Sequence, residues 1–283
     1  MRNITVIISV LFLVALVAVA IVAPMRYDVT ATVGPKLAPP SAEHWFGTDN
    51  LGRDTFTRVA YGARISILLA MAVEATAIVV ALVIGTLAGY GRRWLDATLM
   101  RFTDGMFAFP DILLAILIMG VFRGGDFGLQ EKVPKILIDV FPVFAALAVV
   151  GWPALSRIVR NQVLSLKEQD FVTASRALGA GHFHVIMKHI LPHLWGLISA
   201  IAMVGMAMVI LAEGALSFLG IGVPPPWPSW GLMIQEGREW MRSAPHMIIW
   251  PSIVLSMTIL ALNFVGDALR DRFDPKLQAT RRL

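Results

Sequence analysis

The sequence predicts an all-α membrane protein with six transmembrane helices. The chain of 283 residues is 57% hydrophobic and only 15% charged, whereas a soluble domain is about one quarter charged. The apolar residues are gathered in long runs that contain at most one Asp or Glu each. Backbone polar groups find no water in lipid, so helices or closed barrels must form the spans. These runs are too long for barrel strands, and they lack the alternation of apolar and polar residues that such strands show.

Six runs approach or exceed the length of about 20 residues that a helix needs to cross the hydrocarbon layer. They cover Asn3–Met25, Ile65–Gly91, Gly105–Phe122, Val140–Ser156, Leu194–Val223 and Met247–Gly266. The first run follows Arg2 and has the order of a secretory signal peptide. Its apolar stretch is longer than a signal core, which favours a retained helix.

The loops between the runs define the domain organisation. The predicted segments are a first transmembrane helix (1–25), an external segment (26–64), a transmembrane domain of five helices (65–269) with an internal loop (157–193) and an external loop (221–246), and a tail (270–283). The termini and internal loops hold 14 of the 24 Lys and Arg residues. The positive-inside rule therefore places both termini in the cytoplasm.

Several function classes are excluded or disfavoured by composition. The net charge of +5 is explained by basic residues at membrane ends, and no basic cluster with interleaved aromatics indicates a nucleic-acid partner. The absence of cysteine excludes disulfides, thiolate catalysis and cysteine metal sites. No phosphate-binding loop of the form G-x-x-x-x-G-K-[ST] occurs. We expect no enzymatic activity and no cofactor in this chain.

The internal loop contains a patterned stretch that predicts two short helices around a glycine. Asp170 is the expected N-cap of the first helix, and Gly179 suits the left-handed residue that ends it. The face of the first helix would comprise Phe171, Ala174, Ser175 and Leu178, and that of the second Phe183, Ile186, Met187 and Ile190. Pro192 is expected to stop or kink the second helix. Two interpretations remain open: an amphipathic helix on the lipid surface, or a knob that docks into another protein.

Two carboxyl groups lie inside predicted spans. Glu74 and Glu213 would face the protein interior or a water-filled path, since ionisable groups are costly in lipid. They are candidates for lining a translocation route, with interhelical hydrogen bonds as the alternative. Met203 and Met206 are further candidates for an adaptable lining, or else simple packing.

Two further features concern the external loop and the histidines. Pro224 to Trp230 forms a stiff turn, and Ser229 is expected to cap a short helix after it. Three residues of the external loop are candidates for docking another protein: Trp227, Trp230 and Trp240. The alternative is that these side chains anchor the loop in lipid. His189 and His193 have a metal-ligand spacing, but Pro192 lies between them and no carboxylate or cysteine completes a set, so we expect no metal site.

The patterned stretch resembles the cytoplasmic loop of permease subunits in binding-protein-dependent ABC importers. Its motif is E-A-A, three residues, G, nine residues, I-x-L-P. Thr173-Ala174-Ser175, Gly179 and His189-Ile190-Leu191-Pro192 stand at these positions. Thr173, Ser175 and His189 depart from the motif.

Three other stretches resemble the dipeptide, oligopeptide and nickel branch of that family. They are His44 to Asp54 (H-x-x-G-T-D-x-x-G-R-D), Leu216 to Gly231 (L-S-F-L-G-x-G and a proline-rich turn) and Gly266 to Pro275 (G-D-x-L-R-D-x-x-D-P). Importers of this branch have two homologous permease subunits, and the order and spacing of these stretches are similar to those of the second one.

The resemblance implies a type I ABC importer permease in a bacterial or archaeal cytoplasmic membrane. Its partners would be a homologous permease, two cytoplasmic ATPase subunits, a periplasmic or lipid-anchored substrate-binding protein and membrane lipid. The residues implied in ATPase coupling are Asp170, Phe171, Thr173, Ala174, Ser175, Arg176, Leu178, Gly179, Phe183, Leu191 and Pro192.

The cargo implied by this branch is a dipeptide or oligopeptide, with nickel or another small solute as the alternative. Two other classes stay open: an ion-coupled secondary transporter with Glu74 and Glu213 as proton carriers, and a membrane protein that only docks a cytoplasmic partner. No clear internal repeat supports the ion-coupled class.

Overall fold

A computed structural model of the chain describes residues 2–124 and 133–273, and within these ranges every regular element is helical. The α-helices are α1 (Arg2–Val22), α2 (Thr55–Tyr90), α3 (Arg93–Met106), α4 (Asp111–Gly124), α5 (Lys135–Leu166), α6 (Asp170–Ala177), α7 (His182–Val185), α8 (Leu191–Phe218), α9 (Trp230–Gly237) and α10 (His246–Phe273). Short 3₁₀ turns follow α1 and α9, and a π-helical turn joins α7 to α8. The predicted all-α class is confirmed.

Five helical segments are long and apolar enough to cross a membrane. The remaining predicted span, Gly105–Phe122, which is the third in chain order, is not one straight helix. Most of its residues belong to α4 and the first two to α3, and these two helices are bent by 85° relative to each other, as in a broken span or a re-entrant loop. Pro110 has no backbone N–H to continue α3, and α4 starts directly after it at Asp111. With 14 residues, α4 is roughly 21 Å long, which is short of the hydrocarbon thickness.

The helix α2 starts at Thr55, well before the expected start of the second span at Ile65. The Asp54 carboxylate caps it by accepting a hydrogen bond from the Thr57 backbone N–H at 2.8 Å. The early turns carry Arg64, which interrupts the apolar run. Its guanidinium donates to the backbone carbonyls of Ala20 and Ile21 at the end of α1. An arginine near a membrane boundary is thereby satisfied by protein carbonyls.

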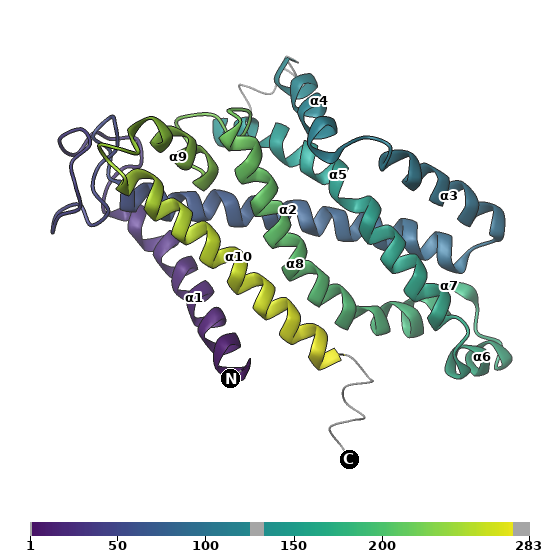
Figure 1. Ribbon diagram of the computed structural model, residues 1–283. Helices are drawn as coiled ribbons and strands as arrows, with labels where there is room; N and C mark the ends of the chain where they lie inside the picture. Colours follow the sequence, from purple (N-terminus) through teal and green to yellow (C-terminus); the bar gives the residue numbers. More distant parts are fainter. Residues whose placement is uncertain (1, 125–132, 274–283) are drawn as a thin grey trace.

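The centre of the bundle is the contact between α2 and α5, which pack against each other over much of their lengths (Figure 1). Glycines permit this approach. A Cβ at Gly85 would lie 2.8 Å from the Ser156 carbonyl oxygen, and one at Gly89 would lie 2.8 Å from the Arg160 carbonyl oxygen. Small residues let backbones of membrane helices come close, where packing replaces the hydrophobic effect. The helices α2 and α5 are therefore a closely packed central pair.

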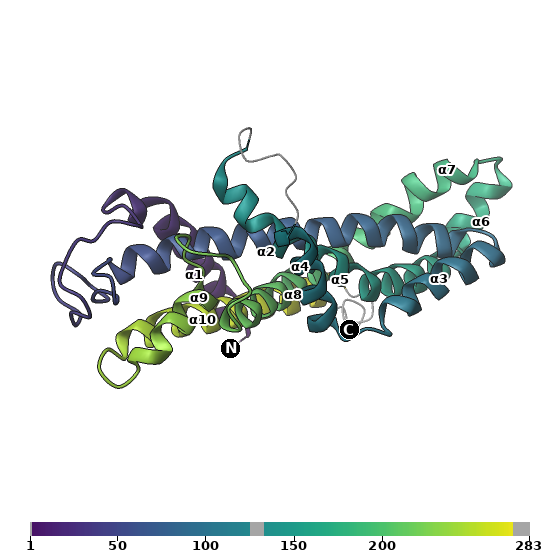
Figure 2. The same ribbon diagram turned by 90° about the horizontal axis from the view of Figure 1, so that it is seen from above.

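The molecule is elongated, with different elements at its two ends (Figure 2). At one end of α2 lie residues 26–54, which we call the cap segment, together with α9. At the other end lie α6 and α7. We call residues 170–190 the knob. The helix α1 begins and α10 ends on the side away from the cap segment (Figure 1).

Candidate coupling and translocation sites

The cap segment is held by the motif His44 to Asp54. The His44 ring lies 2.9 Å from the Asp54 carboxylate, and both side chains are buried. Gly52 has a φ of +78°, and a Cβ there would lie 2.3 Å from the Gly34 carbonyl oxygen. Only glycine fits this left-handed turn without displacing the backbone beside it. The motif is therefore an internal scaffold that attaches the cap segment to α2.

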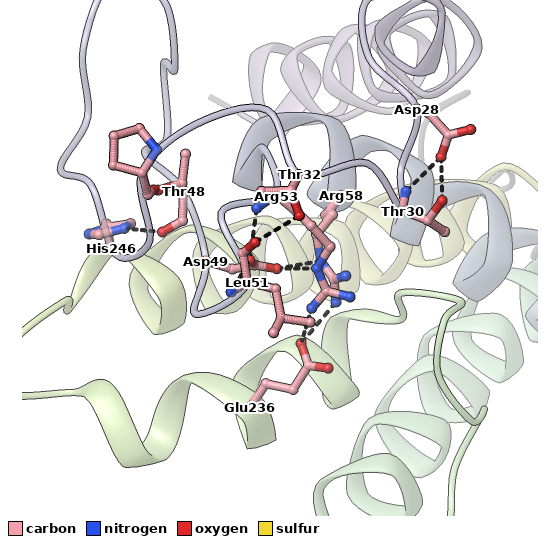
Figure 3. A network of polar contacts seen from close by, with 11 residues as sticks. Asp28, Thr30, Thr32, Thr48, Asp49, Leu51, Arg53, Arg58, Glu236 and His246 are labelled. Carbon is pink, nitrogen blue, oxygen red and sulfur yellow. Dashed lines mark hydrogen bonds and ion pairs between the residues drawn. The ribbon is translucent and has the colours of Figure 1, made fainter.

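A buried charge network joins this scaffold to α9 (Figure 3). The Asp49 carboxylate accepts a hydrogen bond from Arg53 Nε at 2.6 Å. Arg58, only 1% exposed, donates from Nη2 to Glu236 Oε2 at 2.8 Å, and its Nε lies 3.5 Å from Asp49 Oδ2. The cap segment, α2 and α9 are thereby one charge-linked unit. The sequence gives no local signal for the Arg58–Glu236 pair, because 178 positions separate its members.

The three tryptophans predicted as docking residues differ in their burial. The prediction that Trp230 is a docking residue is wrong, because its side chain is 0% exposed and its Nε1 donates to the Val59 carbonyl at 3.0 Å. Trp227 is half-buried and donates to Asp139 Oδ2 at 2.9 Å. Trp240 is half-buried. The predicted cap is confirmed, since Ser229 Oγ accepts from the Leu232 N–H at 3.3 Å. Trp230 anchors α9 into the bundle.

Glu213 forms hydrogen bonds between helices. Its carboxyl group is 1% exposed and accepts from Ser217 Oγ at 2.6 Å and from Ser66 Oγ of α2 at 3.4 Å. Ser217 in turn accepts from Ser229 Oγ at 3.2 Å. Glu213 therefore joins α8, α2 and the start of α9, and its two carboxyl oxygens are both occupied. This geometry corresponds to the structural alternative for Glu213.

Glu74 has a different environment near the middle of α2. Its side chain lines a cavity of about 410 Å³ between α2, α4, α5 and α8, and its Oε1 atom is buried with no hydrogen-bond partner among the described residues. Met203 and Met206 instead pack on the core cluster around Ile210 and Leu262. Of the two acidic candidates, Glu74 alone lines this cavity.

The knob has the predicted helix–glycine–helix form, with one correction at its start. Asp170 is the first residue of α6, and Gln169 occupies the N-cap position with no side-chain cap bond. At the other end Gly179 has a φ of +86°. The Ala180 N–H donates to the Ser175 carbonyl at 3.1 Å and the Gly179 N–H to the Arg176 carbonyl at 2.9 Å. This pair of bonds is the Schellman motif, which fixes the turn.

The knob separates buried and exposed apolar side chains. Val172 and Val185 are 0% exposed and belong to the core cluster at this end of the bundle. Leu178 and Phe183 are 90% and 76% exposed. Phe171, expected on the same exposed face, is half-buried and stacks on the His193 ring at 4.7 Å. The exposed apolar surface is thus smaller than predicted and gathered near the glycine turn.

Polar contacts that the sequence did not predict hold the knob, and the end of α5 beside it, to the end of α2. The Tyr90 hydroxyl lies 3.2 Å from His182 Nδ1, and the Arg176 guanidinium lies 5.1 Å from the centre of the Tyr90 ring. Lys167 Nζ donates to the Gly89 carbonyl at 2.9 Å. The remaining knob candidates have exposed or half-buried side chains: Thr173, Ala174 and Ser175. The knob is therefore held at several points.

Of the two effects expected of Pro192, a stop or a kink of the helix, the stop does not occur. Residues His182–Phe218 form one continuous helical span. The missing N–H of Pro192 is accommodated by a π-helical turn over Ile186–Ile190, in which the N–H of the half-buried Leu191 donates to the Ile186 carbonyl. His189 and His193 are close on this helix, but His193 Nδ1 is bonded to the His189 carbonyl at 2.5 Å. Among the described residues no group of three metal-ligating side chains occurs.

The motif at the chain's end is described only in part. Gly266 packs closely on α8, where a Cβ would lie 3.2 Å from the Ala200 carbonyl oxygen. Asp274 and Pro275, with the rest of the expected tail, lie outside the described residues.

Comparison with known proteins gives consistent relatives. A family model described as "Binding-protein-dependent transport system inner membrane component" matches residues 81–279. The dipeptide transport system permease protein DppC of Alkalihalophilus pseudofirmus is 37% identical over 98% of this chain and 88% of its own length. The oligopeptide transport system permease protein OppC of Bacillus subtilis is 37% identical over 96% of this chain and 85% of its own.

A third relative and a solved structure extend the comparison. The glutathione transport system permease protein GsiD of Pectobacterium atrosepticum is 38% identical over 85% of this chain and 75% of its own. A chain of the MetNI methionine ABC transporter in an inward-facing conformation has a TM-score of 0.60 at 17% identity, over 76% of this chain and 95% of that one. The fold is that of a type I ABC importer permease, and the chain belongs to the family of binding-protein-dependent transport system inner membrane components.

Proposed function

We propose that this chain forms half of the translocation pathway of an ATP-driven peptide importer. Its partners would be a homologous permease, two cytoplasmic ATPase subunits and an external substrate-binding protein. ATP hydrolysis is assigned to the ATPase subunits, and both termini to the cytoplasm. The observation that carries this proposal is the exposure of two large apolar side chains, Leu178 and Phe183, on either side of the glycine turn of the knob.

The knob has the properties of a coupling element. Its buried valines and the contacts of Tyr90 hold it to the long helix α2, whose other end carries the cap segment and α9. A displacement of the knob is therefore transmitted to α2, the helix that carries Glu74. An ATPase dimer that binds the knob differently in its open and closed states would bias the permease between two conformations.

Peptides are the proposed cargo because the three relatives described above are named for dipeptide, oligopeptide and glutathione transport. The test is uptake into vesicles that hold the full complex and ATP, with tripeptides and Ni²⁺ offered separately. We expect ATP-dependent accumulation of tripeptide that requires the binding protein. Accumulation of Ni²⁺ without peptide would favour the alternative cargo, and uptake driven by an ion gradient without ATP would contradict the importer.

Replacing Gly179 with Asp is expected to uncouple ATP hydrolysis from uptake. The position has a positive φ, where a Cβ costs roughly 1 kcal/mol or more. The space around it is open, so the change acts through the turn and through an added charge at the docking surface. Membrane insertion should be normal, since the spans do not depend on this turn. The measurement is ATPase co-purification and ATP-dependent uptake.

Gly181→Asp is the matched control for this change. Gly181 also lies in open space but has an ordinary φ of −70°. We expect a smaller loss in the control. If Gly179→Asp retained wild-type ATPase yield and normal uptake, the knob would be a surface helix and the coupling role would be rejected.

A further inference from the structure

The cavity beside Glu74 has a consistent chemical character. Its volume of about 410 Å³ is within the range of about 300–1,000 Å³ typical of small-ligand sites. Most lining side chains are apolar, among them Met208 and Leu216. The ionisable groups are two carboxyls, Glu74 and Asp111, and the described lining contains no Lys, Arg or His. The cavity is suited to a small, partly apolar ligand that carries a positive charge.

Glu74 is the group that lacks a partner in this cavity. Its side chain is 5% exposed, and the buried Oε1 atom has no hydrogen-bond donor among the described residues. An unsatisfied buried polar atom is costly, and most such atoms in native proteins have partners. Glu213, the other carboxyl buried in a span, has donors on both oxygens. Within the described residues the Glu74 Oε1 atom therefore remains free to accept a hydrogen bond from a bound ligand.

The neighbouring helix leaves room for the Glu74 carboxyl group. Gly205 of α8 faces it, and a Cβ at this position would lie 2.3 Å from the Glu74 carboxyl atoms. Any other residue at 205 would displace the carboxyl. Gly151 lines the same cavity, but a Cβ there would meet its nearest neighbour, Ala77, at an ordinary 3.6 Å. The cavity is thus lined by two glycines, and an added Cβ would collide with the Glu74 carboxyl group at Gly205 but not at Gly151.

We propose that Glu74 binds the α-amino group of the peptide cargo during its passage. This inference rests on the proposed function and assigns the end of the peptide that the chain recognises. An ammonium group would donate to the free carboxyl oxygen, and a charge-assisted hydrogen bond of this kind is strong in a dry site. The apolar lining would accept the first side chains of varied peptides. Asp111, exposed at the start of α4, adds negative charge to the cavity wall.

A cysteine placed in the cavity tests this proposal, because the chain has no native cysteine. The reporter is Ala154→Cys, whose parent residue lines the cavity and is exposed. The full complex in nanodiscs, without binding protein, is labelled with a maleimide in the presence of trialanine or N-acetyl-trialanine. We expect trialanine to slow labelling of this chain, and the acetylated peptide to require at least about tenfold higher concentration. Met241→Cys, on the external loop, should be unaffected by either peptide.

Variants of Glu74 and the two glycines complete the test. Glu74→Gln and Gly205→Ala should remove the preference for the free amino group, while Glu74→Asp and Gly151→Ala should keep part or all of it. Equal protection by both peptides, or protection unchanged in Glu74→Gln, would overturn the proposal, as would peptide uptake with no protection at all. If no peptide is transported by the complex, the proposed function itself fails, which is a separate result.

Discussion

Replacing Leu178 or Phe183 with Asp is expected to abolish co-purification of the ATPase subunits. The two side chains are 90% and 76% exposed, so their replacement removes little packing inside this chain. In the proposed complex they are buried in an apolar cleft, where a carboxylate without a partner is strongly unfavourable. Central apolar anchors of an interface commonly cost about 2 kcal/mol or more when they are truncated. We expect at least a 30-fold loss of ATPase affinity for each variant.

The control is Met241→Asp on the external loop, a change of the same kind at a side chain that is 59% exposed. It should leave ATPase co-purification unchanged. Expression and membrane insertion of all three variants should match the wild type. ATPase yields at the wild-type level for both knob variants would show that these side chains contact lipid or solvent instead.

The second large effect is expected at the charge network of the cap segment. Glu236→Leu would leave Arg58, 1% exposed, without its closest carboxylate. Breaking one half of a buried ion pair costs about 3–5 kcal/mol, because the remaining charge is desolvated and unpaired. Since Glu236 retains 19% exposure, we expect a loss near the lower limit. The measurement is thermal unfolding of the detergent-purified chain, with protease cleavage of residues 26–54 as a local readout.

A double variant separates the unpaired charge from lost packing. Arg58→Met combined with Glu236→Leu removes both members of the pair, and Asp49 keeps Arg53 as its partner at 2.6 Å. The double variant should be more stable than Glu236→Leu alone, as expected when two partners of a buried pair are removed together. If the single and double variants were equally stable, the pair would not be what holds α9 to α2.

The sequence predicted features that depend on local geometry. A helical pattern that ends at Gly179 predicts a left-handed conformation there, and the structure gives a φ of +86°. An apolar helical pattern that follows Ser229 predicts a cap, and the Ser229 hydroxyl accepts a hydrogen bond from the Leu232 N–H. The family that the four motifs resemble is confirmed, and so is the fold class.

The features that the sequence did not predict depend on distant contacts or on competing local solutions. The apolar run begins just after Arg64, which indicates a helix boundary, but α2 starts earlier, at Thr55, because carbonyls distant in sequence accept hydrogen bonds from that arginine. Trp230 has the composition of an interfacial anchor, yet its indole fills a core formed by other helices. Pro192 is compatible with a helix end or with a π-turn, and packing of Ile190 and Leu194 in one cluster selects the continuous helix. Gly205 gains its role only from Glu74, on another span.

In the proposed complex, residues near Gly179 contact an ATPase subunit. Because the chain has no cysteine, Leu178→Cys introduces a single thiol at the most exposed part of the knob. A short photoactivatable reagent attached to this thiol should cross-link the chain to an ATPase subunit in the assembled complex. The same reagent at Met241→Cys should give no such product. A cross-link to the ATPase from residue 241, or products with lipid alone from residue 178, would contradict this contact between the knob and the ATPase.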